Sequence, residues 1–164
     1  MKSIVFDDRS ITIKIDSQVL AHIYQYRQTE VLQKEAGGVL IGRELESTGN
    51  LIIEKVTEPK NNDKRSRCRF ERRDQEHLEF FQKLYLDSRE TYGYFGEWHT
   101  HPERIPHYSE IDRRHWNEIF RELPEQHLLL FLIVGIDEIG IWKLDLNAFE
   151  QPIKVNETEW ISLV

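Results

Sequence analysis

The sequence has very little cysteine, proline and glycine, and it lacks any long apolar segment. Its 164 residues include one Cys, five Pro and eight Gly. The lone cysteine, Cys68, excludes an intramolecular disulfide. No apolar run reaches the ~18 residues that a membrane-spanning helix needs, and the N-terminal stretch MKSIVFDDRS lacks the apolar core of a signal peptide. We therefore expect a cytoplasmic protein without a membrane partner.

An excess of positive charge is also missing. The 22 basic and 29 acidic residues give a formal net charge of -7. Binding to nucleic acid in general needs a basic surface that neutralises phosphates, so this balance argues against a nucleic-acid partner. Residues 60–73 are a local exception, because basic residues outnumber acidic ones there. This segment could dock an acidic partner or form a solvated loop, and the sequence leaves both interpretations open.

The hydrophobic content, 39% of the residues, suffices for one core but not for two, so residues 1–164 should form a single domain. The most apolar segment, HLLLFLIVG, should be a central strand. Strands and helices that mix without regular alternation indicate an α+β fold. Strands are predicted at 3–6, 11–15, 36–45, 51–58, 68–71, 92–100, 127–135 and 139–146. Helices are predicted from Asp16 or Ser17 to about Gln33, at 74–89 and at 109–121. Residues 59–67 are predicted to be a loop, and the tail after Asn147 has no assignment.

The stretch GEWHTHPERIPHYSEID, residues 96–112, is unusually rich in metal-binding side chains. Side chains two apart on a strand point the same way, so Glu97, His99 and His101 should share one face. Pro102 ends the strand because it has no amide to donate. Two imidazoles on one face are the start of a chelate.

Ser109 is a natural N-cap, which puts Asp112 in the first turn of the following helix. If this helix end faces the strand, two imidazoles and one carboxylate converge. Three such ligands leave a fourth tetrahedral position open, as in catalytic zinc sites. A hydrolase of this kind also needs a carboxylate that moves protons. Glu97 and Glu35 are both candidates, and spacing alone favours neither.

The pattern HTHP, six further residues, then SEID resembles the H-[ST]-H-P-x6-S-x-x-D signature of the JAMM/MPN+ (JAB/Mov34) zinc metalloproteases. EAGGVLIG resembles the glutamate-bearing strand that precedes it in that family. The resemblance runs from about residue 11 to 146. The form GEWHTHP, without an aromatic pair before the first histidine, is most similar to the bacterial branch. In this comparison Glu97 is expected to support the site from outside the ligand set.

The resemblance implies a mixed α/β sandwich in which helices flank a curved sheet, with a cytidine-deaminase-like layering. It also implies one Zn²⁺ per chain, held by His99, His101 and Asp112. Glu35 would be the general acid/base, and the hydroxyl of Ser109 would help to stabilise the oxyanion.

Family members cleave the bond that follows the C-terminal tail of a protein modifier. The chain looks most like the deconjugating peptidases of CBASS antiphage operons, in which the tail belongs to a cyclic-oligonucleotide synthase and E1- and E2-like enzymes act in the same pathway. A bacterial ubiquitin-like protein is a close second as the substrate. Two other classes remain: a catalytically inactive MPN-type scaffold, and an amidase for small molecules or a nuclease that uses the same metal site.

Other histidines are weaker candidates. His107 and His115 are close enough along the chain to replace a ligand in a looser version of the motif. His22, His77 and His127 have no matching partners in the sequence.

Overall fold

One mixed sheet of eight strands organises the protein. The computed structural model describes residues 1–123, 125–147 and 150–164. The elements are β1 (Ile4–Asp8), β2 (Ile11–Ile15), α1 (Ser17–Tyr24), β3 (Gly37–Glu44), β4 (Leu51–Val56), β5 (Lys64–Ser66), β6 (Arg69–Glu71), α2 (Glu76–Asp87), β7 (Gly93–Thr100), α3 (Glu110–Glu122), β8 (Leu128–Val134), β9 (Glu138–Asp145), β10 (Ile153–Glu159) and α4 (Trp160–Leu163). The large sheet has the order β1-β2-β4-β3-β7-β8-β9-β10, and β5 and β6 form a separate hairpin. The predicted α+β fold is confirmed.

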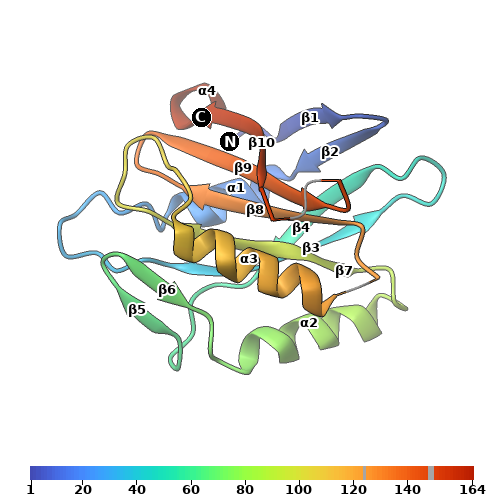
Figure 1. The fold of residues 1–164 in the computed structure, drawn as a ribbon, viewed down its shortest axis with the longest axis horizontal. Coiled ribbons are helices and arrows are strands. Elements are labelled where there is room, and N and C mark those ends of the chain that lie inside the picture. The colour runs from blue at the N-terminus through green and yellow to red at the C-terminus, as the bar shows by residue number, and fades with distance from the viewer. Residues whose placement is uncertain (124, 148–149) are drawn as a thin grey trace.

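The large sheet is so strongly curved that its two ends approach each other. The buried Lys143 of β9 donates hydrogen bonds of 2.7 and 2.6 Å to the carboxylate of Asp8, at the end of β1. The amide of Lys2 donates to the carbonyl of Leu163 at 2.7 Å. Both chain ends therefore lie together beside α4 (Figure 1).

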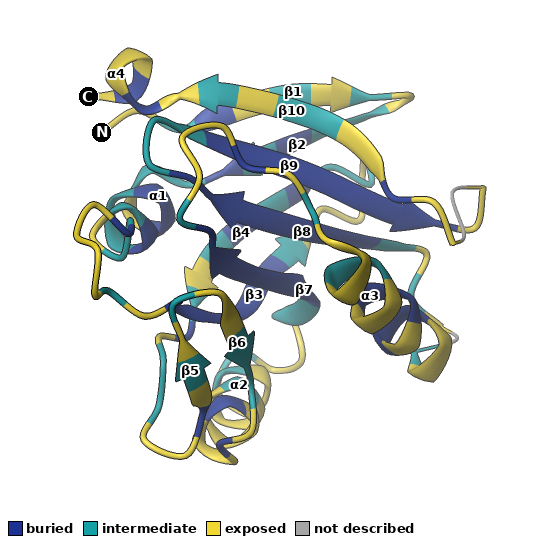
Figure 2. Cartoon of the chain, turned by 60° about the vertical axis from the view of Figure 1, so that its left-hand side comes forward, coloured by how far each residue is buried: buried dark blue, intermediate teal, exposed yellow. Residues whose placement is uncertain are grey.

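Two apolar cores lie on opposite faces of the central strands. The larger core fills the concave side and includes Trp98. The smaller core lies under α3, where the ring of Trp116 stacks on Phe131 with centroids 4.5 Å apart, and includes Trp142. The buried strands β7, β8 and β9 run between these two layers (Figure 2).

A glycine allows β7 to lie close against β8. Gly96 has φ +120, a backbone conformation that favours glycine, and a Cβ at this position would lie 1.9 Å from the carbonyl oxygen of Leu130. The strand pair is parallel and aligns His99 with Ile133. This close approach places His99, near the end of β7, beside the end of β8, the most apolar strand.

The long helix predicted up to Gln33 is wrong, because α1 ends at Tyr24. The predicted cap is confirmed, since the side chain of Asp16 accepts a hydrogen bond from the amide of Gln18 at 2.9 Å. Beyond Tyr24 the apolar spacing no longer faces a core: Val31 and Leu32 are 74% and 92% exposed. The segment instead crosses to the start of β3 as an irregular connection.

Two further assignments need correction. Residues 59–67, predicted as loop, contain β5, which pairs with the short strand β6 that the sequence did predict. The tail after Asn147 contributes β10, an edge strand that pairs antiparallel with β9. Both strands are short or exposed and lack a clear apolar alternation. No helix in the described part of the chain is long and apolar enough to cross a membrane.

Candidate metal centre

The strand β7 presents the two histidines as its period-two alternation predicts. Trp98, in the larger core, and Thr100 are both fully buried. His99 points to the opposite face, where its ring centroid lies 6.3 Å from that of Trp116 in α3. His101 follows directly after the strand, and its amide donates to the carbonyl of Val134 at 3.0 Å, so it stays in register with β8.

The start of α3 brings the carboxylate to the histidines. Ser109 is an N-cap with extended φ and ψ and forms a capping box with Asp112. The hydroxyl of Ser109 accepts from the amide of Asp112 at 3.2 Å, while its amide and hydroxyl each donate to the Asp112 carboxylate at 2.6 Å. These bonds restrict the orientation of the Asp112 carboxylate.

The three predicted ligands converge on one point. Ligand atoms of His99, His101 and Asp112 all lie within 4.8 Å of one another. The two Nε2 atoms are 3.1 Å apart, and they lie 3.3 and 3.5 Å from Oδ1 and Oδ2 of Asp112. The three side chains are only 11%, 11% and 15% exposed. These three residues, which are separated along the sequence, therefore form a compact and largely buried cluster in the fold.

The electrostatics of this cluster stabilise positive charge. Burial opposes ionisation of Asp112, but hydrogen bonds with His101 and His99 outweigh it and hold the pKa of the carboxyl well below its usual range. Burial lowers the pKa of His101, yet contact with Asp112 outweighs burial and raises that pKa. Two facing imidazole nitrogens with an anionic carboxylate form a donor set that fits Zn²⁺, which prefers nitrogen ligands with a carboxylate in catalytic sites.

Glu35 lies in the irregular connection just before β3, outside the three-residue cluster. It is 4% exposed. Burial raises the pKa of its carboxyl from 4.5 to about 8, while the charge of His101 acts in the opposite direction and that of Asp112 adds to the increase. A carboxyl with this pKa can exchange a proton near neutral pH, which is the property a general acid/base needs.

Glu97 has the opposite electrostatic environment. It accepts a hydrogen bond from Nε of Arg72 at 2.8 Å and lies 3.2 Å from Nε2 of His115. Burial alone would raise its pKa, but these two partners lower it to about 2. Glu97 therefore stays ionised and is held in a charge network that joins the residue after β6 to β7 and α3, an arrangement suited to support and not to proton transfer. Arg72 carried no sequence signal for this contact.

The remaining histidines and the cysteine lie outside the cluster. His107 is exposed, with its Nδ1 3.9 Å from Glu103. His77, for which the sequence shows no matching ligand partner, is fully buried. Its Nδ1 lies 2.6 Å from Oγ1 of Thr57, and its Nε2 lies 2.8 Å from Oδ2 of Asp63. Cys68 is exposed. These residues are structural or peripheral in the described part of the chain.

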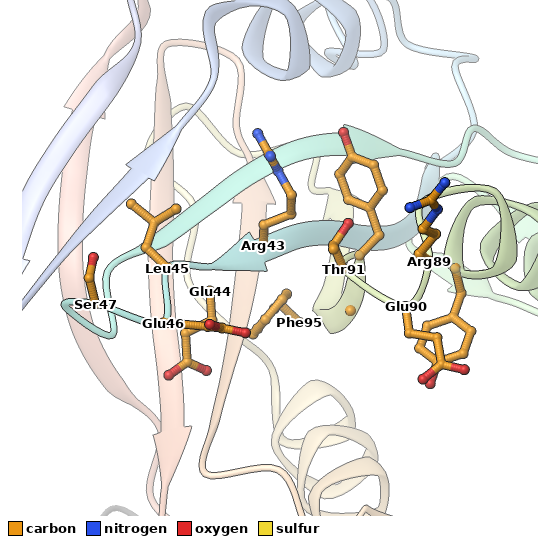
Figure 3. A pocket seen from close by; sticks show the side chains of 12 residues that line it. Arg43, Glu44, Leu45, Glu46, Ser47, Arg89, Glu90, Thr91 and Phe95 are labelled. Atoms are coloured by element: carbon orange, nitrogen blue, oxygen red, sulfur yellow. The ribbon is translucent and has the colours of Figure 1, made fainter.

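A large hollow lies far from the candidate metal centre. Its volume is about 1150 Å³, and its lining includes Arg43, Tyr85 and Arg89 (Figure 3). It sits where β7 begins at Gly93, six residues from His99, which corresponds to roughly 20 Å along a strand. Its mixture of charges and aromatic rings does not single out a ligand.

The chain matches a known family along most of its length. The family described as prokaryotic homologs of the JAB domain matches residues 16–145. Curated proteins named CD-NTase/cGAS isopeptidase are similar: one from Escherichia coli is 37% identical over 145 residues, covering 87% of this chain and 89% of that protein. Another from Vibrio cholerae is 37% identical over 142 residues, covering 85% and 87%. A third, from Pseudomonas aeruginosa, is 34% identical over 141 residues, covering 86% and 88%.

A solved structure supports the same architecture. The solution structure of a protein from Desulfitobacterium hafniense superimposes with a TM-score of 0.58 at 19% identity, covering 91% of this chain and 90% of that one. At this level of identity the likeness shows the fold alone.

Proposed function

Because the chain belongs to the family of prokaryotic homologs of the JAB domain, we propose that it is a zinc-dependent isopeptidase that cleaves after the C-terminal tail of a protein modifier. The modifier would be a cyclic-oligonucleotide synthase, in line with the names of the curated relatives. The observation that carries this proposal is the convergence of His99, His101 and Asp112 in one largely buried cluster. E1- and E2-like enzymes that attach such a modifier stay a prediction from the sequence resemblance.

His99, His101 and Asp112 would hold the metal through two imidazole nitrogens and a carboxylate oxygen. A zinc ion bound there would polarise the scissile carbonyl and lower the pKa of water. The capping bonds of Ser109 keep the Asp112 carboxylate turned toward the histidines, and packing against Trp116 limits the rotation of the His99 ring. The protein thus presents its ligands in a preorganised arrangement.

Glu35 would accept a proton from the attacking water and donate it to the departing amine. Its raised pKa of about 8 makes the protonated form accessible at neutral pH, and a nearby cation would lower that pKa toward the working range. Glu97 is unsuited to this role because Arg72 and His115 hold it in the ionised state. Burial and pairing therefore favour Glu35 over Glu97 as the acid/base.

Ser109 would support the substrate oxyanion through its hydroxyl, which now donates to Asp112. The substrate tail would lie extended alongside a strand, so that backbone hydrogen bonds provide affinity. These two roles rest on the family resemblance and on the position of Ser109 beside the cluster.

The test measures zinc content and cleavage together. Wild type should bind one zinc and release the tail from a tail-fused protein. Glu35→Gln should retain zinc and lose about 10²- to 10⁴-fold in kcat, the usual contribution of a general acid/base. His99→Ala and Asp112→Ala should lose both zinc and cleavage. His127→Ala is the matched control, because His127 is exposed and adjoins the end of β8 remote from the cluster.

The alternatives predict different results. Zinc without cleavage of any tail-fused protein, but with hydrolysis of small amides or oligonucleotides, would point to an amidase or nuclease. No zinc and no cleavage would favour the scaffold. Full activity of Glu35→Gln together with an inactive Glu97→Gln would overturn the assignment of the acid/base.

A further inference from the structure

Much of the positive charge of the basic segment at residues 60–73 is paired with other groups of the protein. Arg65 and Arg67, in and beside the β5–β6 hairpin, both donate to backbone carbonyls of the irregular connection between α1 and β3. Arg72 pairs with Glu97, and Arg69 and Arg73 both pair with Glu71. These guanidinium groups are engaged within the fold, so the segment has less free charge for an acidic partner than its composition indicates.

The connection that carries Glu35 depends on its neighbours for its shape. Residues 28–36, here called the strap, are neither helix nor strand. The buried Gln28 donates to the carbonyls of Gln33 at 3.0 Å and Arg67 at 2.8 Å, and accepts from the hydroxyl of Thr100 at 3.0 Å. The strap is therefore tied to both the hairpin and β7.

Glu35 itself is held by the hairpin at three points. Its amide donates to the carbonyl of Ser66 at 2.8 Å, and its carbonyl accepts from Nε of Arg65 at 2.6 Å. Its carboxylate accepts a hydrogen bond from the backbone of Phe70. The Phe70 ring also covers Gly37, where a Cβ would lie 2.5 Å from it.

The hairpin can serve as a support because its base is fixed in the core. The buried Asp63 accepts from the amides of Lys60 at 2.7 Å, Arg73 at 2.8 Å and Asp74 at 3.0 Å. It also lies 2.8 Å from Nε2 of the fully buried His77. The two ends of the hairpin are thus joined to one buried carboxylate.

We propose that Arg65 is a positioning residue for the acid/base Glu35. Its guanidinium donates to the carbonyl of Glu35 and, at 3.5 Å, to that of Lys34, so it restrains the backbone of Glu35. The Glu35 carboxyl interacts electrostatically with His101 and Asp112 of the metal cluster. Arg65 thereby acts on proton transfer through Glu35 and does not bind the substrate. This inference rests on the proposed function of the site.

The experiment compares Arg65→Gln with Arg69→Gln in the zinc-loaded protein. Arg69 is the matched control because it lies in the same hairpin and pairs with Glu71, away from the strap. Arg65→Gln should lower kcat about 10- to 100-fold with KM and zinc content unchanged, since small misplacements of a catalytic group are costly. Arg69→Gln should behave as wild type. Arg65→Lys keeps the charge but not the planar fork and should fall between the two.

A second readout does not depend on activity. Exchange of the Glu35 amide hydrogen should become at least about ten-fold faster in Arg65→Gln and stay unchanged in Arg69→Gln, because loss of a charge-assisted hydrogen bond loosens the strap. If wild type cleaves no tail-fused protein, the proposed function fails while amide exchange still tests Arg65. If Arg65→Gln does not fold, Arg65→Lys supplies the same comparison.

Two results would overturn the inference. A raised KM with unchanged kcat in Arg65→Gln would make Arg65 a docking residue. Unchanged amide exchange at Glu35 would show that the strap keeps its shape without the guanidinium.

Discussion

Replacing Glu35 by glutamine should stabilise the zinc-free protein at neutral pH, although it removes the proposed acid/base. Burial raises the pKa of the Glu35 carboxyl from 4.5 to about 8. Below pH 4.5 the carboxyl is protonated in both the folded and the unfolded chain, so it does not affect stability. Between pH 4.5 and about 8 the unfolded chain loses this proton while the folded chain keeps it, so stability falls as pH rises.

The size of the effect follows from these two pKa values. Each pH unit above 4.5 lowers the free energy of unfolding by ~1.36 kcal/mol while the folded chain retains this proton. At pH 7 the retained proton therefore costs about 3 kcal/mol of stability. The buried amide of glutamine offsets about 1 kcal/mol of the gain, since one of its donors lacks a partner. Glu35→Gln should therefore be about 2 kcal/mol more stable than wild type, or roughly 4–8 °C in Tm for a chain of this size.

The assay is thermal unfolding of both proteins with zinc removed, at pH values from 4.5 to 8. A metal ion would lower the pKa of Glu35 and mask the effect. Glu46→Gln is a suitable control, because it changes an exposed carboxylate in the turn between β3 and β4 and should alter stability by no more than about 0.5 kcal/mol. Equal stability of Glu35→Gln and wild type at pH 7, or a difference that does not grow with pH, would refute the argument from burial.

Three other substitutions probe the framework around the site. His77→Ala should lower the free energy of unfolding by about 3 kcal/mol, measured by urea denaturation, because the buried Asp63 loses a partner; a loss below about 1 kcal/mol would contradict this. Gly96→Ala should cost at least ~3 kcal/mol or prevent folding, since its Cβ would lie 1.9 Å from the carbonyl oxygen of Leu130; a normal Tm would count against the close approach of β7 and β8. Glu97→Gln should be less stable than wild type by about 3 kcal/mol above pH 4.5 and equally stable near pH 2. The reason is that the lowered pKa of Glu97 contributes stability that disappears as pH falls from 4.5 to about 2. A stability difference that does not depend on pH would exclude the ion pair as the source of that difference.

Local patterns anticipated much of the fold. The hairpins β1–β2 and β3–β4 were predicted from short apolar segments on either side of turns, and they form as expected. The alternation in β7 correctly separates Trp98 from His99, because adjacent strand residues must point to opposite faces. The capping box at Ser109 also depends only on neighbouring residues.

Long-range contacts determined the structure of the two segments that the sequence patterns did not predict correctly. The segment after Tyr24 has residues that could continue a helix, yet Gln28 and Arg67 hold it in an irregular path across the hairpin. β10 has too little apolar alternation to be predicted, and it forms because β9 offers an unpaired edge. Tertiary hydrogen bonds outweigh weak local propensity in both cases.

The sequence by itself determined the identity and spacing of the candidate ligands and the family to which the chain belongs, because HTHP and SEID are local patterns. Spacing alone left Glu35 and Glu97 as equal candidates for proton transfer, and it was the family resemblance that implied Glu35. Only the tertiary structure gave the two carboxyls different electrostatic environments: burial dominates at Glu35 although the charge of His101 opposes it, whereas Glu97 meets Arg72 and His115 from distant parts of the chain. A pKa depends on burial and on neighbouring charges in space, and neither is present until the chain has folded.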